Sequence, residues 1–272
     1  MDEIQTLLLK AKDDVYTHLQ GSNFSKILGQ GYDFSELRPY ESSDDIRHIS
    51  WINSVKLGEP YVKKMHEERE LLVHVSVLLD GRAVIGKKHA LMTYVLATLG
   101  YSSVATNNLF EASFILGTEF KGFESTKNIE AVEILLNEFS TIEPLNLELE
   151  YEKIQDRLLK LQEQKSLFFL VGDFLDEVDL SILAQKHELC VIIVRDKWEE
   201  NPTLASDVEL VNPLSNSSIS KSLSTKSILH YKKKLEEHDT KLYAHFHKHK
   251  IKYVKVYDRD EVFQKLEALF YF

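Results

Sequence analysis

Residues 29–80 read GQGYDFSELRPYESSDDIRHISWINSVKLGEPYVKKMHEERELLVHVSVLLD, and this stretch decides the fold. From Tyr61 onward apolar and polar side chains alternate, and the run from Leu71 to Leu79 is apolar on both of its sides. Alternation is typical of a strand with one solvent-facing side, whereas a two-sided apolar run indicates a strand buried on both faces. The pattern predicts one long strand that begins at Tyr61 and ends at Asp80.

Beyond Asp80, strands and helices alternate to the end of the chain. Apolar runs predict strands at residues 109–116, 166–171, 189–194 and 251–256, and helical spacing predicts helices at 90–102, 129–139, 151–164, 226–250 and 261–270. This alternation is typical of a parallel sheet covered by helices on both faces. We therefore expect a doubly wound α/β domain with a mainly parallel sheet over residues 71–272, preceded by a helical and β extension over residues 1–70.

The extension has patterns of its own. Residues 4–19 carry apolar side chains at helical spacing, which predicts a helix whose apolar stripe docks on the main domain. Further on, we expect Ser43 or Asp44 to cap a short helix that turns Ile46, Ile49 and either Ile52 or Trp51 inward. Near the other end of the chain, the serine-rich residues 212–227 lack periodicity and indicate a loop or hairpin.

Composition limits the classes of function. The chain has 272 residues, of which 43% are hydrophobic and 28% charged, and its net charge is −10. This charge disfavours unspecific binding to nucleic acid or to an anionic membrane. The single cysteine, Cys190, lies in an apolar run, so we interpret it as a buried thiol and expect a reducing compartment. No window approaches the ~20 apolar residues of a transmembrane helix, and no signal peptide is evident, so we expect a cytoplasmic protein.

Two carboxylates follow predicted strands. Asp80 ends the first of these strands, and Asp173 comes directly after the apolar run that ends at Val171 and Gly172. In open α/β sheets, ligands bind beyond the carboxyl ends of the strands. A pair of carboxylates there is suited to a hard metal ion, although the same residues could instead cap helices or bind a cation of the protein itself.

A phosphate-binding pattern overlaps the same place. Gly81 to Lys87 fits G-x-x-x-x-G-K between a strand and a helix, which suggests a nucleotide-binding enzyme. However, Lys88 stands where a serine or threonine should hold Mg²⁺, and bulky side chains occupy the loop. Two further histidines, His245 and His249, lie four positions apart and could chelate a metal together, but a solvated helix end is the simpler interpretation.

The stretch from Gly29 to Asp80 resembles the defining region of the domain of unknown function 58 (DUF58) family, whose pattern is roughly G-x-G-x-E-F-x-x-L-R-x-Y-x-x-G-D-D-x-R-x-I-D-W-x-x-x-A-R. The matching residues are Gly29, Gly31, Phe34, Leu37, Arg38, Tyr40, Asp44, Asp45, Arg47, Ile49 and Trp51. The resemblance implies a von Willebrand factor A-like α/β domain. It also implies a MoxR-type AAA+ ATPase as partner and a non-enzymatic adaptor or assembly role.

The chain departs from the family pattern at several positions. Asp33, Ser43, Ser50 and Lys56 replace the family's Glu, Gly, Asp and Arg. The family's metal-ion-dependent adhesion site begins D-x-S-x-S, and here Asp80 is followed by Arg82 and Val84 at the serine positions. Our hypothesis is that Arg82 takes the place of the cation and pairs with Asp80 and Asp173. We expect no cofactor, and Mg²⁺ is disfavoured because two hydroxyl ligands are missing.

The fingerprint residues also have a physical interpretation. Arg38, Asp44, Asp45 and Arg47 are close enough in sequence to form an ion-pair knot around Trp51. The knot could hold the extension onto the main domain, or it could be a surface on which a partner docks. Three functions remain open: a binding protein that works with a MoxR-type ATPase, a nucleotide-binding enzyme, and a metal-dependent adhesion-type binder using Asp80 and Asp173.

Overall fold

A six-stranded sheet forms the centre of the computed structural model, which describes residues 3–19, 34–41, 44–46, 49–65, 71–161, 164–203 and 205–269. Its strands lie in the order β10-β7-β6-β3-β4-β5. They are β3 (Leu72–Leu79), β4 (Leu109–Leu116), β5 (Glu119–Thr126), β6 (Leu167–Gly172), β7 (Glu188–Val194) and β10 (Lys252–Val256). Neighbours pair in parallel except β5, which is antiparallel to β4. The predicted α/β fold with a mainly parallel sheet is confirmed.

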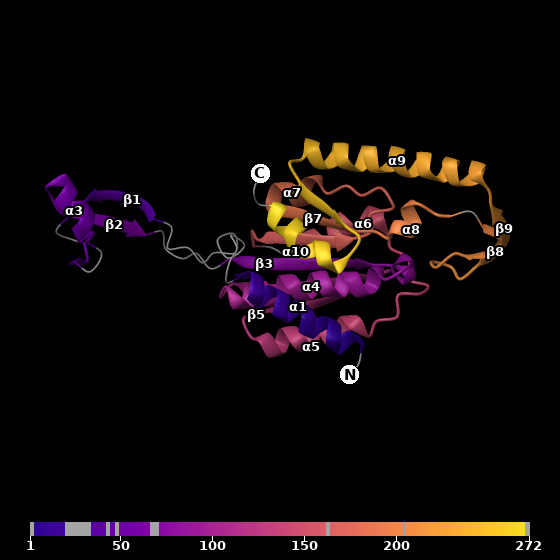
Figure 1. Cartoon of the computed structure of the whole chain (residues 1–272), viewed down its shortest axis with the longest axis horizontal. Helices are drawn as coiled ribbons and strands as arrows, with labels where there is room; N and C mark the ends of the chain where they lie inside the picture. The colour runs from indigo at the N-terminus through magenta and orange to yellow at the C-terminus, as the bar shows by residue number, and fades with distance from the viewer. Residues whose placement is uncertain are drawn as a thin grey trace.

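Helices cover both faces of this sheet. One face packs on α1 (Glu3–Leu19), α4 (Lys88–Ala105), α5 (Ile129–Ser140) and α10 (Arg259–Ala268), and the other on α6 (Tyr151–Leu161), α7 (Ser181–Lys186) and α9 (Thr225–Lys248). Figure 1 shows α9 on one side of the sheet and α1, α4 and α5 on the other. Strand side chains alternate between the two cores, so Val75 and Val77 pack on the first face and Leu78 on the second.

Helix α1 docks on the α/β body, as its apolar stripe predicts. The side chains of Leu8, Ala11 and Val15 are buried in the same core as α4. The hydroxyl group of Tyr94 on α4 donates a hydrogen bond to the Asp14 carboxylate of α1. The N-terminal helix therefore belongs to the packing of its own chain.

The prediction of one long strand from Tyr61 to Asp80 is wrong. Residues Tyr61–Met65 form β2, which pairs antiparallel with β1 (Phe34–Pro39) in a separate two-stranded sheet. Residues 66–70, in the middle of the predicted strand, lie outside the described residues. The two halves of the predicted strand differ physically: an alternating strand suits a small two-stranded sheet, whereas β3 is buried on both faces.

The short helix of this unit also differs from the prediction. Helix α3 spans Trp51–Leu57 with Ser50 at the N-cap position, so it begins after Asp44, and Ser43 lies outside the described residues. Of the side chains expected to face inward, Ile49 is half-buried beside Val62, whereas Ile46, Trp51 and Ile52 point outward, with exposed fractions of 62%, 63% and 75%. The inward side of α3 is polar instead, because Ser54 is buried and its hydroxyl oxygen accepts the Tyr61 N–H at 2.8 Å.

Smaller elements complete the chain. The serine-rich residues 212–227 supply the turn and the second strand of a hairpin, in which β8 (Ala205–Val211) pairs antiparallel with β9 (Ser218–Leu223). A hairpin was one of the two predicted interpretations. The helix α8 (Lys197–Glu200) and the single-turn 3₁₀ helix η2 (Gly81–Val84) were not predicted, and neither was β5. Burial raises the pKa of Cys190 to about 12, which keeps this thiol protonated. Within the described residues, no helix combines the length and apolar character needed to cross a bilayer.

Candidate functional site

The candidate site lies between β3 and β6, where the chain stops adding strands on one side of the sheet and begins to add them on the other. The chain passes from β3 to β4 on one side and later returns to β6 on the other side of β3, so β3 and β6 are neighbours. Their carboxyl ends lead into Asp80 and Asp173, and each of these residues is 3% exposed. This reversal is the position at which open α/β sheets characteristically bind ligands. The structure therefore brings together the two acids that the sequence singled out, and we call this region the carboxyl edge.

Arg82 closes around Asp80. The 3₁₀ turn of η2 directs the Arg82 main-chain N–H to Asp80 Oδ1 at 2.9 Å and its Nε to Asp80 Oδ2, also at 2.9 Å. The Nη2 group of Arg82 contacts the same Oδ2 atom. An arginine–carboxylate pair of this kind is both charged and directional. The Asp80 carboxylate is thus engaged by a neighbour only two positions along the chain.

The same guanidinium reaches the second strand. Arg82 Nε lies 3.3 Å from Asp173 Oδ2, and its Nη2 lies 2.8 Å from Asp176 Oδ2. The hydroxyl group of Tyr151, at the start of α6, donates to Asp173 Oδ1 at 3.3 Å. Arg82 therefore joins the ends of β3 and β6, and Tyr151 supplies a neutral donor to the second carboxylate.

Lys88 is a second cation at the carboxyl edge. Its side chain is 1% exposed, and its Nζ atom lies 2.9 Å from both carboxylate oxygens of Glu199. The same Nζ atom lies 3.3 Å from Asp173 Oδ2. Sequence reasoning noticed Lys88 only as a misfit to a phosphate-binding pattern. The signal for its role was weak, because Glu199 is 111 positions away along the chain.

The electrostatics of the carboxyl edge follow from burial and from these pairs. Burial raises the pKa of Asp80, and repulsion from the Asp173 carboxylate raises it further. Burial alone would lower the pKa of Arg82, but Asp173 and the hydrogen bond to Asp80 raise it above its ordinary value. Burial, then Asp173 and Asp80, raises the pKa of Tyr151, which stays a protonated donor. Arg82 is consequently a permanent cation between carboxylates.

The residues of the carboxyl edge do not fit a divalent metal. A hard cation needs free oxygen ligands, yet the Asp80 and Asp173 oxygens accept hydrogen bonds or ion pairs from Arg82, Lys88 and Tyr151. Val84 is 40% exposed and offers no oxygen from its side chain. Across the described ranges, no three His, Cys, Asp or Glu side chains are arranged to hold a metal ion.

The phosphate-binding pattern does not form a phosphate cradle. The main-chain N–H groups of Gly81, Ala83 and Ile85 donate to Leu147 O, Asp80 O and Arg82 O at 2.8–3.1 Å. A phosphate loop needs these groups free to point at its ligand. A Cβ atom added to Gly86 would meet the Asp196 carboxylate at 2.1 Å, so an acidic group also lies against the loop. This geometry opposes the nucleotide-binding hypothesis.

The histidine pair has a structural partner. The rings of His245 and His249 lie 4.7 Å apart on α9, and the Leu180 N–H donates to His245 Nε2 at 3.1 Å. His245 also lies 3.7 Å from the Asp179 carboxylate, at the side of a cavity of about 570 Å³. Because Nε2 already accepts a main-chain hydrogen bond, that nitrogen is not free for a metal ion.

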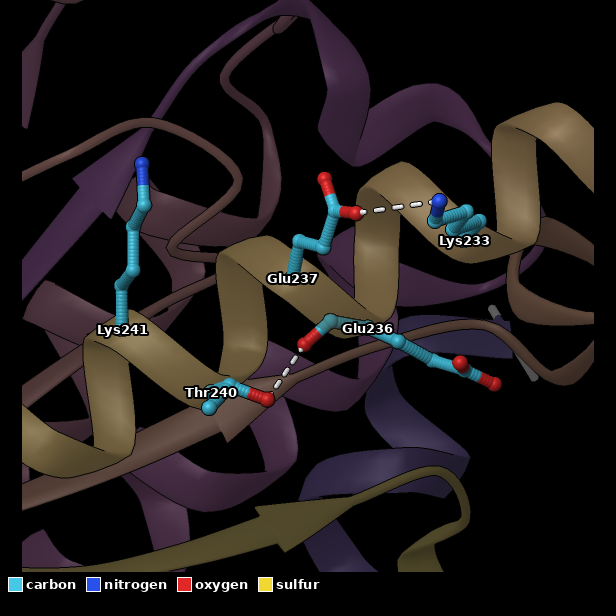
Figure 2. A pocket seen from close by; sticks show the side chains of 5 residues that line it. All are labelled: Lys233, Glu236, Glu237, Thr240 and Lys241. Atoms are coloured by element: carbon cyan, nitrogen blue, oxygen red, sulfur yellow. Dashed lines mark hydrogen bonds and ion pairs between the residues drawn. The ribbon is translucent and has the colours of Figure 1, made fainter.

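A second depression lies along α9. Figure 2 shows that its labelled side chains all come from this one helix, with an ion pair from Lys233 to Glu237 at 3.8 Å. The Thr240 hydroxyl donates to the main-chain oxygen of Glu236 at 2.7 Å (Figure 2). No second element closes over it among its lining residues, so it is the solvated face of a helix.

Comparison with known proteins identifies the family. The family model described as "Protein of unknown function DUF58" matches residues 36–241, which is most of the chain. The chain belongs to the DUF58 family. Uncharacterized proteins Rv1480 of Mycobacterium tuberculosis and Mb1516 of Mycobacterium bovis are each 23% identical over 217 residues, covering 76% of this chain and 68% of theirs.

Two solved structures are more distantly similar to this DUF58 chain. The conserved hypothetical protein BatB from Bacteroides thetaiotaomicron gives a TM-score of 0.41 at 11% identity, over 73% of this chain and 98% of BatB. The pilus adhesin SpaC from Lactobacillus rhamnosus GG gives 0.37 at 9% identity, over 74% of this chain and 29% of SpaC.

The DUF58 fingerprint forms a compact ion pair, but not around Trp51. Arg38 donates two hydrogen bonds to the Asp44 carboxylate, from Nη1 to Oδ2 at 2.9 Å and from Nη2 to Oδ1 at 2.5 Å. Asp44 Oδ2 also accepts the Glu41 N–H at 2.9 Å. The Tyr40 N–H donates to Pro60 O at 2.8 Å, which ties the strand to the turn before β2. Asp45 lies on the same turn, and Arg47 lies outside the described residues. Trp51 stays open to solvent instead of being enclosed.

Proposed function

We propose that this DUF58 chain is a non-enzymatic protein-binding module. In this proposal it works in the cytoplasm with a MoxR-type AAA+ ATPase, in the assembly or remodelling of another protein. The fingerprint residues support the partner, because they resemble the family in which such an ATPase accompanies the domain.

One observation carries the proposal: an apolar face on α3. Trp51, Ile52 and Val55 lie on one side of this helix and are 63%, 75% and 83% exposed. Fully burying one such side chain is worth about 1.5–3 kcal/mol, and tryptophan is a frequent hot spot of protein interfaces. We call these residues the α3 face. A surface of this kind inside the fingerprint suits the docking of a protein partner.

The chemistry of the carboxyl edge also supports a binding role. Its buried acids are engaged by Arg82 and Lys88, so they are poor candidates for general acid–base catalysis. The thiol of Cys190 is buried and protonated, which makes it a poor nucleophile. These features favour recognition over reaction at the sites that the sequence singled out.

The test uses the full chain and a purified MoxR-type ATPase from the same organism. Binding is measured by biolayer interferometry with ATP, ADP or a non-hydrolysable ATP analogue. We expect a complex in at least one nucleotide state and a loss of about tenfold or more in affinity for Trp51→Ser, the size of a ~1.4 kcal/mol contact. Ile134→Ser, which changes a 68% exposed side chain on α5, is the matched control and should bind normally.

Two results would overturn the proposal. One is the lack of binding in every nucleotide state, with both proteins folded by circular dichroism. The other is equal affinity for wild type, Trp51→Ser and Val55→Ser, since the α3 face would then not be the docking surface.

A further inference from the structure

We propose that the carboxyl edge is a cation site that the chain fills with two of its own side chains, Arg82 and Lys88. In this arrangement no divalent metal takes part, and Lys88 excludes a metal independently of Arg82. The inference concerns the metal chemistry of the edge and stands apart from the choice of partner in the proposed function.

Charge balance is the first argument. Asp80, Asp173 and Glu199 are 3%, 3% and 7% exposed, and buried carboxylates require compensating cations or strong hydrogen bonds. Arg82 forms ion pairs with Asp80 and Asp173, and Lys88 forms ion pairs with Asp173 and Glu199. The two cations thus share Asp173 and cover all three acids. A divalent ion entering this cluster would meet two positive charges within the same few ångströms.

The geometry of Asp173 is the second argument. Its Oδ2 atom lies 3.3 Å from Arg82 Nε and 3.3 Å from Lys88 Nζ, and its Oδ1 atom accepts the Tyr151 hydroxyl at 3.3 Å. Both oxygens of the carboxylate are therefore occupied. Removing Arg82 alone leaves the Lys88 ammonium on Oδ2, and Lys88 is 1% exposed, so it has no route to solvent in this conformation.

Lys88 also has a mechanical role in this arrangement. It is the first residue of α4, and Glu199 belongs to α8, so their ion pair joins two elements across the carboxyl edge. In a metal site a ligand can be exchanged at the ion. Here a rearrangement of the edge has to break charge-assisted hydrogen bonds between fixed elements instead.

The experiment measures Mn²⁺ binding to the full chain by electron paramagnetic resonance and calorimetry. The wild type is compared with a serine variant, Arg82→Ser with Val84→Ser, and with an unlocked variant that adds Lys88→Met and Glu199→Gln. The last two changes remove both charges of a pair, so Glu199 is not left as an unpaired buried anion. Lys87→Met, next to Lys88 but exposed, is the control for charge alone.

We expect the wild type, the Lys87→Met control and the serine variant to bind Mn²⁺ no tighter than about 10⁻³ M, and the unlocked variant to bind at least about tenfold tighter. Micromolar binding by the wild type that is lost in Asp80→Ala would overturn the proposal. So would equal affinity of the serine and unlocked variants, because Lys88 would then exclude nothing.

A measurement on the wild type covers the case in which the unlocked variant does not fold. The proposal requires the thermal midpoint of the wild type to be unchanged by EDTA and by millimolar Mn²⁺, since a bound ligand raises it. A midpoint that rises with Mn²⁺ and falls with EDTA contradicts it. The two proposals fail separately, because this measurement uses the chain alone, whereas the docking assay uses the ATPase with nucleotide and without EDTA.

Discussion

Arg195 holds Asp173 by its main chain: Arg195 Nε donates to the carbonyl oxygen of Asp173 at 2.5 Å. Its Nη2 atom donates to Phe174 O at 3.1 Å and to the Asp239 carboxylate of α9 at 3.1 Å. Phe174 has a φ of +50°, a conformation that costs a non-glycine residue energy and needs support from its surroundings. Arg195 gives this support from the end of β7, and so it sets where the Asp173 side chain can point.

Replacing Arg195 should therefore destabilise the fold. The side chain is fully buried, and removing one partner of a buried ion pair costs about 3–5 kcal/mol, so we expect a loss of this size for Arg195→Met in urea denaturation. Lys197→Met, at a 68% exposed side chain two positions away, should change stability by less than about 0.5 kcal/mol. Equal stability of the two variants would show that Arg195 does not support the turn.

Neighbouring leucines on α1 test how this helix docks. Leu8 is 7% exposed and lies in the core with α4, whereas Leu9 is 50% exposed. Leu8→Ala should lower the free energy of unfolding by about 2–5 kcal/mol because it leaves a cavity, and Leu9→Ala should cost well under that. Thermal and chemical denaturation measure both. Similar losses for the two variants would mean that α1 does not pack through this stripe.

His187 should make stability depend on pH. The Ser166 N–H donates to His187 Nδ1 at 3.3 Å, and burial lowers the pKa of His187 from 6.5 to about 4. Between these values the unfolded chain binds a proton that the folded chain does not. The free energy of unfolding should therefore fall as pH falls from 6.5 toward 4, by up to about 1.4 kcal/mol per pH unit from this group.

The measurement compares urea denaturation of wild type and His187→Asn at several pH values. Asparagine keeps an acceptor for the Ser166 N–H but does not titrate. A difference between the two proteins in how the free energy of unfolding changes with pH is therefore caused by His187. His230→Asn, on an exposed part of α9, is the control and should follow the wild type. Parallel pH curves for wild type and His187→Asn would contradict the prediction.

Gly81 should tolerate no side chain. A Cβ atom at this position would lie 2.1 Å from the main-chain oxygen of Pro213, between η2 and the turn of the β8–β9 hairpin. Gly81→Ala should cost at least about 1–3 kcal/mol, because main-chain atoms cannot move aside as a side chain does. At Gly122 the nearest atom is the end of the Phe120 ring at 3.1 Å, so Gly122→Ala should be milder. Denaturation midpoints of the two variants decide the matter.

The architecture was predictable because its core strands are short apolar runs between helical patterns. Strand β5 was missed because Glu119–Thr126 is largely exposed, so it has neither an apolar run nor a clean alternation. Helix α8 is a single turn, too short for a periodic signal. The prediction that Trp51 or Ile52 faces inward was wrong. The sequence showed the spacing of the apolar side chains of α3, but it did not show that Ser54 makes the inward contact.

The candidate site was predictable only where contacts are local or follow from sheet topology. Arg82 is two positions from Asp80, and the carboxyl ends of neighbouring strands bring Asp173 beside them. Lys88 and Glu199 could not be paired from the sequence, because 111 positions separate them and α8 itself was not foreseen. Long-range ion pairs depend on where loops return, and a single sequence does not encode that in any pattern.

The outer strands of the central sheet have a consequence for assembly. β5 carries Glu119, Lys121 and Glu124, and β10 carries Lys252 and Lys255. Charges on the rim of a sheet discourage another chain from adding a strand there, which is how natural sheets avoid growing into fibres. These rim charges therefore direct contacts with other chains to helices and loops, and away from the edges of the sheet.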